Sequence, residues 1–190
     1  MAFPAGTPDL PVGAPPRALV FRATRRGGVE YRTGVVTLRL EPMTDQQYLR
    51  YRERAEAEYA RNIADSGAMP LPEAEAKARK DYERLLPDGL ATPGQELWTA
   101  YDGDDEVGML WLQIEQKSDG PHAFGYDFEV REELRRKGYG RAIAQAAVEL
   151  CRERGVRSIG LSVFGFNHGA RALYEELGFE VTTIQMTKRL

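Results

Sequence analysis

Four segments of the chain are predicted as strands, and in the first of them hydrophobic residues alternate with polar or small ones, as in a strand that has one buried face. In VVTLRL, the first of them, Val36, Leu38 and Leu40 fall on one side. The turn sequence DGDDE joins the second segment to the third, and short connections join antiparallel neighbours. We therefore predict a hairpin with further strands beside it, drawn from residues 35–40, 96–101, 107–115 and 123–130.

Three longer segments have helical character instead. Residues 46–63 and 73–86 are rich in good helix formers, and Thr44 and Gln47 have the spacing of a capping box at the start of the first. A third helix is predicted over residues 139–155, because its apolar residues form one stripe and Gly155 ends it. That stripe consists of Ile143, Ala146, Ala147, Leu150 and Cys151.

The pattern of the last 33 residues predicts three further elements. They are a strand over 158–164, a short helix over 168–177 with Asn167 as its N-cap, and a last strand over 179–190. The third helix lies between the strands 123–130 and 158–164, so it acts as a crossover and those two strands should be parallel. The pattern as a whole predicts a mixed α/β fold, with a mostly antiparallel central sheet and helices on its faces.

Length and composition indicate one domain. The chain has 190 residues, 42% of them hydrophobic, which is enough for one core and leaves little room for a second. Residues 1–17 are rich in Pro and Gly and predict a loosely packed arm, whereas residues 18–34 fit either an edge strand or a surface segment. Neither a secretory signal nor a run of about 18 apolar residues is present, so we expect a cytoplasmic protein with no membrane partner.

Charge and metal-ligand content exclude several kinds of site. The net charge of −3 argues against a surface built for nucleic acid. One cysteine, Cys151, and two histidines, His122 and His168, cannot form a metal-ligand cluster, so we expect chemistry without a metal.

The segment LRRKGYGR, residues 134–141, has the composition of an anion cradle at the start of a helix. Backbone N–H groups point out of a helix N-terminus, and the glycines Gly138 and Gly140 let that backbone approach a phosphate closely. Lys-Ser or Lys-Thr does not follow, and a third glycine is missing, so the segment is neither a P-loop nor a dinucleotide fingerprint. A solvated basic loop is the alternative. The charged side chains are Arg135, Arg136, Lys137 and Arg141.

Two motifs together resemble the GNAT superfamily of N-acetyltransferases. The segment RRKGYG after FEV matches the family motif Arg/Gln-x-x-Gly-x-Gly/Ala, and FNHGARALYEELGFE resembles its Asn...Leu-Tyr-Glu-x-Leu-Gly-Phe segment. The resemblance covers residues 35–190 and leaves residues 1–34 as a partly mobile amino-terminal arm. It implies the GNAT fold, in which the parallel strands splay apart, and a bacterial single-domain enzyme.

The resemblance also implies acetyl-CoA as the donor. Its pyrophosphate would bind the backbone from Arg136 through Tyr139 to Arg141, and its pantetheine arm would run along Phe128 to Val130, with Asn167 near the thiol end. Polarisation of the thioester carbonyl would come from the N–H around Val130. Unpaired N–H and C=O groups at the edge of a strand readily bind another extended chain, which agrees with this arrangement.

The family pattern assigns Tyr174 as the acid that protonates the leaving thiolate. Tyr174 lies seven residues after Asn167, two turns along one helix face, although an ordinary apolar stripe also explains it. Glu129 is our candidate base, and Asp127 on the same strand face or a water relay is the alternative. An exposed sheet face or an ion pair with a nearby Arg would explain both carboxylates structurally. Some relatives have Glu where this chain has Ser162, and His168 is expected at the surface.

The acceptor is expected between the first two helices and the middle strands. Trp98, Trp111 and Tyr126 are aromatic candidates there, or else core residues. The expected acceptor is a small-molecule or peptide amine, and fold alone does not select among amines. A non-catalytic acyl-CoA-binding or sensing module is the alternative function. Homodimers are common among such enzymes, and the arm or the last strand are the candidates to form one.

Overall fold

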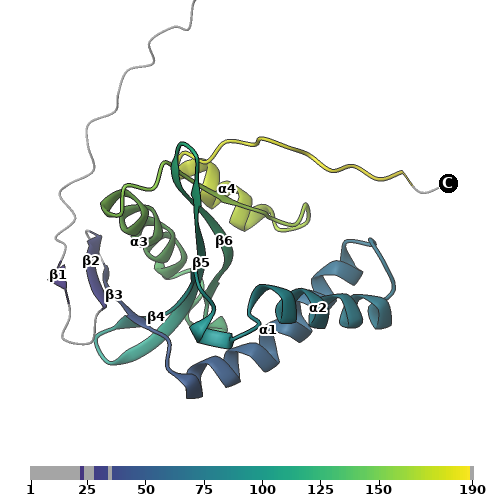
Figure 1. Ribbon diagram of the computed structural model, residues 1–190, viewed down its shortest axis with the longest axis horizontal. Helices are drawn as coiled ribbons and strands as arrows, with labels where there is room; N and C mark the ends of the chain where they lie inside the picture. The colour runs from purple at the N-terminus through teal and green to yellow at the C-terminus, as the bar shows by residue number, and fades with distance from the viewer. Residues whose placement is uncertain (1–21, 24–27, 34–35, 189–190) are drawn as a thin grey trace, which may run out of the picture.

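A computed structural model describes residues 22–23, 28–33 and 36–188 of the chain (Figure 1). Most of the predicted amino-terminal arm lies outside the described residues, as do the last two residues of the predicted final strand.

One mixed sheet runs through the molecule, with its strands in the order of the sequence. Neighbouring strands are antiparallel except β6 and β7, which are parallel, so the predicted fold class is confirmed. Residues 18–34 were expected to form either an edge strand or a surface segment, and the strand prediction is confirmed for residues 22–23 and 29–33. The strands of the described chain are β1 (Arg22–Ala23), β2 (Val29–Thr33), β3 (Val36–Pro42), β4 (Gln95–Asp102), β5 (Asp105–Lys117), β6 (Gly120–Val130) and β7 (Ser158–Leu161).

The helices begin where the sequence provides a cap. Thr44 Oγ1 accepts the N–H of Gln47 at 3.3 Å, and Gln47 Oε1 accepts the N–H of Thr44 at 3.0 Å, which is the predicted capping box. No described helix is both long and apolar enough to cross a membrane. The helices are α1 (Asp45–Asp65), α2 (Leu71–Leu85), α3 (Tyr139–Glu153) and α4 (His168–Glu176), with short 3₁₀ turns η1 (Gly89–Ala91) and η2 (Glu132–Leu134).

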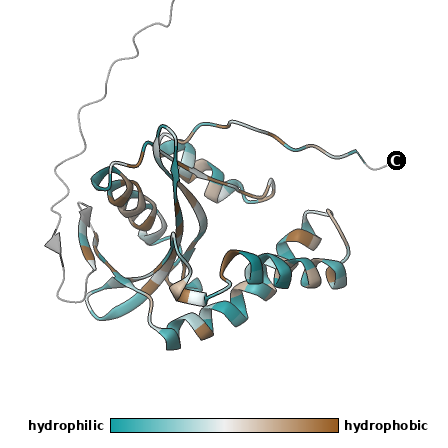
Figure 2. Cartoon of the chain, viewed as in Figure 1, coloured by the Kyte–Doolittle hydropathy of each residue, from teal (hydrophilic) through white to brown (hydrophobic). Residues whose placement is uncertain are grey.

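Helices cover both faces of the sheet (Figure 1). Leu110 and Leu112 of β5 pack with the apolar stripe of α3 on one face, while Met109 and Trp111 pack with α1 and α2 on the other. Successive strand residues point to opposite faces, so one strand serves both cores. The remaining surfaces of α1 and α2 are largely hydrophilic (Figure 2).

A β-bulge interrupts β6 just before its last residues. The register pairs Leu112 with Gly125 but Trp111 with Asp127, so Tyr126 is the extra residue. Beyond the bulge Asp127 and Glu129 both contact α1, which confirms that they share a face of the strand.

The prediction of a last strand over 179–190 is wrong for residues 179–188. These residues form no strand, and residues 180–188 are exposed. They run away from the sheet after α4 (Figure 1). A strand needs a neighbour for its N–H and C=O groups, and this path reaches none within the described chain.

Candidate functional site

The turn between β6 and α3 has an unusual backbone. Arg136 has φ 65° and Gly138, the residue before the helix, has φ 92°, so both adopt the left-handed conformation. Such a conformation is rare for a residue with a Cβ atom and is concentrated at functional sites. Left-handed residues in a turn can direct successive N–H groups toward one side, where these groups form a concave anion site.

The first turn of α3 adds further unpaired donors. The first bond within the helix runs from the N–H of Ala142 to the C=O of Gly138 at 3.1 Å, so the N–H groups of Tyr139, Gly140 and Arg141 have no acceptor inside the helix. The positive end of the helix dipole lies at the same place. The backbone is thus arranged for a phosphate group, and the side chains of Arg135, Arg136 and Lys137 are exposed around it.

The parallel strands β6 and β7 separate beside this turn. Their pairing ends where Gly125 lies opposite Leu161, and β6 continues to Val130. The predicted strand 158–164 therefore stops at residue 161. In the described chain no strand pairs with residues 126–130 of β6 on that side, which confirms the predicted splay.

Main-chain groups of β6 point into the gap. Arg131 donates its N–H to the C=O of Val107 in β5 at 3.0 Å, and alternate residues of an antiparallel strand point the other way. The N–H groups of Phe128 and Val130 are therefore directed away from β5, toward the gap. Arg135 donates Nε to the C=O of Val130 at 3.3 Å, which joins the turn to the end of β6.

The cradle, the end of β6 and α4 converge at one point. A Cβ atom built on Gly140 would lie 3.7 Å from Val130 Cγ2 and 3.7 Å from Leu173 Cδ2. Asn167 caps α4 as predicted, since its Oδ1 accepts the N–H of Ala170 at 3.1 Å. An ion pair between Arg141 and Glu176 also links the start of α3 to the end of α4.

Tyr174 of α4 packs against β6 next to the gap. Its ring centre lies 5.9 Å from that of Phe128 and 5.5 Å from that of Phe179, both edge to face. Burial, with the charge of Asp127 as a smaller cause, raises the pKa of Tyr174 to about 12. The phenol therefore keeps its proton at neutral pH.

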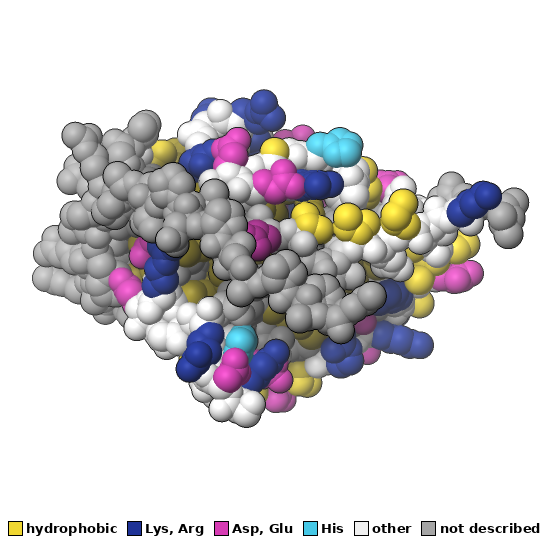
Figure 3. Space-filling model, turned by 90° about the horizontal axis from the view of Figure 1, so that it is seen from above, with side chains coloured by type: hydrophobic (Ala, Val, Ile, Leu, Met, Phe, Trp, Pro, Cys, Tyr) yellow, Lys and Arg dark blue, Asp and Glu magenta, His cyan; other side chains and the backbone are white. Residues whose placement is uncertain are grey.

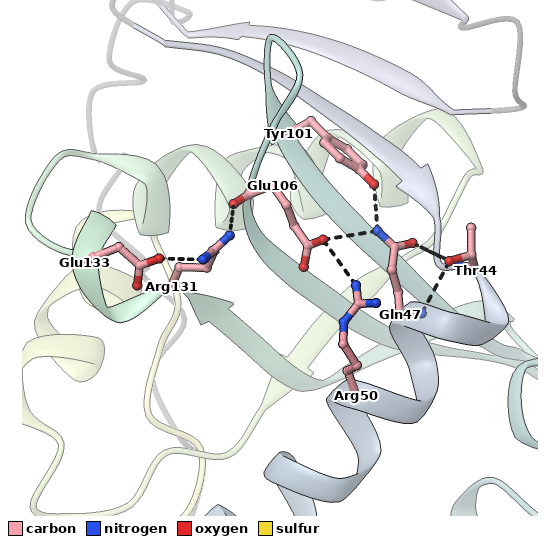
Figure 4. Close-up of polar contacts among 7 residues, drawn as sticks. All are labelled: Thr44, Gln47, Arg50, Tyr101, Glu106, Arg131 and Glu133. Carbon is pink, nitrogen blue, oxygen red and sulfur yellow. Dashed lines mark hydrogen bonds and ion pairs between the residues drawn. The ribbon is translucent and has the colours of Figure 1, made fainter.

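A cavity of about 380 Å³ opens between α1, the start of β5, the end of β6 and the turn. Gln47 donates to Tyr101 Oη at 2.6 Å and to Glu106 at 3.3 Å, and Arg131 binds Glu133 at 2.7 Å (Figure 4). These bonds hold the charged side chains on the wall of the cavity. Its lining is Met43, Gln47, Arg50, Tyr51, Arg54, Glu58, Glu106, Gly108, Met109, Glu129, Arg131, Glu132, Glu133 and Arg135.

The two candidate carboxylates of β6 have different surroundings. Glu129 lines the cavity and pairs with Arg54 of α1. Asp127 lies deeper and accepts a hydrogen bond from Tyr51 Oη at 2.9 Å. Burial, with the charge of Glu129 second, raises the pKa of Asp127 to about 6.

The aromatic acceptor candidates lie outside this cavity. Trp98 packs in the core on the α3 face, and Trp111 and Tyr126 pack in the core on the other face, where their ring centres are 4.7 Å apart. His168 and Ser162 are exposed.

The acceptor was expected beside the first helix, but the residues of α1 that line the cavity were not among the predicted site residues. The residues involved recur every three or four positions, which places them on one helix face, and that spacing was the available signal. They are Gln47, Arg50, Tyr51, Arg54 and Glu58.

Comparison with known proteins identifies the family. The sequence profile of the acetyltransferase (GNAT) family matches residues 54–179. An uncharacterized N-acetyltransferase of Bacillus subtilis (strain 168), YycN, is 34% identical over 156 residues, which cover 82% of this chain and all of YycN. YdgE, from the same strain, is 31% identical over 152 residues, 80% of this chain and 97% of YdgE. The chain belongs to the GNAT acetyltransferase family.

Solved structures agree with this assignment. The crystal structure of YycN has a TM-score of 0.78 to this chain, covering 80% of it and 98% of YycN. A GCN5-related N-acetyltransferase from Ralstonia eutropha JMP134, 18% identical, has a TM-score of 0.59 and shares the fold.

The Asp127→Asn variant should change how stability depends on pH. The pKa of Asp127 is raised from 3.8 to about 6 in the folded protein, so its burial lowers the free energy of unfolding as pH rises from about 4 to about 6. Two pKa units correspond to about 3 kcal/mol, and the variant should lack this decrease. Urea unfolding at pH 4 and pH 7 measures it. Equal pH dependence in wild type and Asp127→Asn would contradict it, and exposed Glu75→Gln is the control.

Proposed function

We propose that this protein transfers the acetyl group of acetyl-CoA to a primary amine. The observation that supports the proposal is the meeting of two sets of unpaired main-chain donors, those at the start of α3 and those of β6 in the gap beside β7. The first set suits a pyrophosphate and the second an extended chain of amides. A pantothenate-bearing nucleotide has both groups in one molecule.

The residues of the turn would bind the donor. Backbone N–H groups from Arg136 to Arg141 would hold the pyrophosphate, and the exposed charges of Arg135 and Lys137 would surround it. Main-chain groups of Phe128 and Val130 would pair with the pantetheine amides, with Asn167 near its thiol end. Acetyl-CoA supplies an acetyl group already activated as a thioester.

Two groups near the gap would assist the breaking of the carbon–sulfur bond. The N–H of Val130 would donate to the carbonyl oxygen of the thioester and stabilise the charge that develops there. Tyr174 would give its proton to the departing sulfur, because its phenol is protonated at neutral pH and its ring packs against Phe128 beside the gap.

Glu129 would remove the proton of the amine. An alkylamine with a pKa of about 10.4 needs about 4.6 kcal/mol to lose its proton at pH 7. Glu129 faces the cavity, where Arg54 orients its carboxylate, whereas Asp127 lies deeper against Tyr51. The amine nitrogen would then bond to the acetyl carbon as the carbon–sulfur bond breaks.

The cavity beside α1 would bind the acceptor. Five of its lining residues are glutamates, so its wall offers ion-pair partners to a cationic amine. Four arginines line it too, and they would suit an acceptor that also bears an anionic group. Small-molecule and peptide amines both fit this chemistry.

Release of free thiol from acetyl-CoA tests the proposed function. Purified protein is incubated with acetyl-CoA and a panel of primary amines, and mass spectrometry follows the gain of an acetyl group on each amine. We expect amine-dependent release from at least one of them. Binding of CoA without release from any amine would favour the non-catalytic acyl-CoA-binding module, and absence of CoA binding would exclude both functions.

The Tyr174→Phe variant should lower kcat and leave CoA binding unchanged. Loss of a general acid typically costs a factor of about 10² or more. Steady-state kinetics and calorimetric titration with CoA measure the two quantities. Tyr59→Phe, which removes a phenol between α1 and α2, is the matched control. A Tyr174→Phe enzyme with the wild-type kcat would refute the role of this phenol.

The Gly138→Ala variant should weaken CoA binding about tenfold, which corresponds to about 1.4 kcal/mol. Gly138 has φ 92°, a conformation that is strained for a residue with a Cβ atom. Alanine at this position should therefore move the turn and the N–H groups of the turn. Gly155→Ala is the matched control, because Gly155 has φ 67° just beyond the other end of α3, and open space surrounds a Cβ at both positions. Equal affinities of the two variants for CoA would count against the cradle.

A further inference from the structure

One guanidinium group of the cavity, that of Arg50, has only a loose carboxylate partner. Its Nη2 lies 3.9 Å from Glu106 Oε2, at the limit of an ion pair, and its side chain is 58% exposed. The same carboxylate oxygen already accepts a hydrogen bond from Gln47 Nε2 at 3.3 Å (Figure 4). A guanidinium group has five N–H donors, and no side-chain hydrogen bond within the described chain uses those of Arg50.

The other three arginines of the cavity are engaged by groups of the protein. Arg54 pairs with the candidate base Glu129. Arg131 binds a glutamate of η2 at 2.7 Å, and Arg135 donates to a main-chain carbonyl at the end of β6 at 3.3 Å. A ligand anion would have to displace these partners, whereas at Arg50 it replaces only a distant carboxylate.

Arg50 also lies close to the place where the amine would react. It precedes Arg54, the partner of Glu129, by one turn of α1, and side chains four residues apart on a helix are neighbours, with Cβ atoms about 6 Å apart. A ligand whose amine is at Glu129 therefore has its next few atoms beside Arg50. The volume of about 380 Å³ is that of a site for a small molecule.

The charges around Arg50 favour an anion with a single charge. Five glutamates and four arginines line the cavity, so its formal charge is negative and a phosphate dianion would be repelled. A carboxylate matches the planar guanidinium with two parallel N–H···O bonds. It also has the charge of the Glu106 carboxylate that it would replace, so the balance of charge at Arg50 would be kept.

The surface seen in Figure 3 does not offer a stronger basis for selection by charge. Acidic and basic side chains lie next to one another over this face, and the residues coloured there form no broad patch of one sign. A large charged partner is attracted by such a patch. Selection of an acceptor by charge is therefore better served by the paired groups inside the cavity than by this face.

We propose that the acceptor is a small amine with a carboxylate a few bonds from its nitrogen, as in a free amino acid. The amine binds at Glu129, and the carboxylate binds the guanidinium of Arg50, which makes Arg50 a specificity-determining residue. This inference rests on the proposed acetyl transfer. In that transfer the nitrogen gives its proton to Glu129 and bonds to the acetyl carbon, the carbon–sulfur bond breaks, and Tyr174 protonates the sulfur.

Matched acceptors test this assignment with the wild-type protein. Thiol release from acetyl-CoA gives kcat/KM for free amino acids with small, acidic and basic side chains, for the carboxamide of each, for a diamine and for an aminoalkyl phosphate. We expect kcat/KM of the best amino acid to exceed that of its carboxamide and of the other amines about tenfold or more, because a hydrogen bond to a charged group typically contributes that much. Equal or greater release with the carboxamide, the diamine or the aminoalkyl phosphate would overturn the inference while retaining the acetyl transfer.

Binding distinguishes failure of this inference from failure of the proposed function. Calorimetric titration with the same amino acids and carboxamides, in the presence of CoA, requires no turnover. If no amine releases thiol, the acetyl transfer fails, and binding of an amino acid about tenfold tighter than its carboxamide still supports the site at Arg50. Equal binding of the two, or binding of neither, would then overturn the site as well.

The Arg50→Gln variant locates the selection. It should bring the ratio of amino acid to carboxamide, in kcat/KM or in affinity, to about one. Arg61→Gln is the matched control and should keep the wild-type ratio, because Arg61 is exposed on the same helix and does not line the cavity. Far-UV circular dichroism verifies folding. A folded Arg50→Gln protein with the wild-type ratio would overturn the role of Arg50, and the wild-type panel decides if the variant does not fold.

Discussion

The structure depends on the place where β6 loses its partner on one side. Up to Gly125 the strand is paired with β5 and β7, and from there on only with β5. The bulge at Tyr126 falls at the same point. Extra twist at a bulge bends the strand, so β6 turns away from β7 where their pairing stops. The gap, the turn that follows β6 and the position of α3 all result from this single change.

The bulge also decides which side chains face which layer. After Tyr126, Asp127 and Glu129 point to α1, while Phe128 and Val130 pack with the core on the α3 side. One extra residue thus puts the carboxylates beside the cavity and leaves the N–H groups of Phe128 and Val130 directed toward the gap. The candidate carboxylates and the main-chain donors of the proposed reaction therefore come from the same short stretch of β6.

Several ion pairs around the site lie at the surface and hold it loosely. The pair between Arg141 and Glu176 joins side chains that are about half exposed, and such pairs contribute less than about 1 kcal/mol. Arg141 is therefore free to exchange its partner for a phosphate at little cost. Arg54 and Glu129 differ, because the glutamate is less exposed and the pair fixes α1 to the end of β6.

Local patterns in the sequence were sufficient for most of the fold. The hairpin strands at 96–101 and 107–115, the capping box at Thr44 and the stripe of α3 each depend on near neighbours, and all appear as predicted. The parallel pair followed from the crossover rule. The cradle was recognisable because its glycines lie next to a helix start.

The other features depend on distant parts of the chain. The position of the bulge depends on the register between β5 and β6, and the pairing of Glu129 with Arg54 depends on how α1 crosses the sheet. The strand-like segment 179–188 illustrates the limit best. Its residues are typical of a strand, yet residues 179–188 form none, because pairing requires a neighbouring strand that no local pattern determines.

The open stretch of β6 is bounded on the side of the gap. The gap-side edge of β6 is bounded by the left-handed turn and the start of α3, whose donors favour an anion, and its open stretch is only five residues long. A charged ligand with a short amide arm fits it better than a strand does. Phe179 touches Tyr174, and Tyr174 touches Phe128 of β6, so these three rings hold the end of α4 against the stretch of β6 that has lost its second partner.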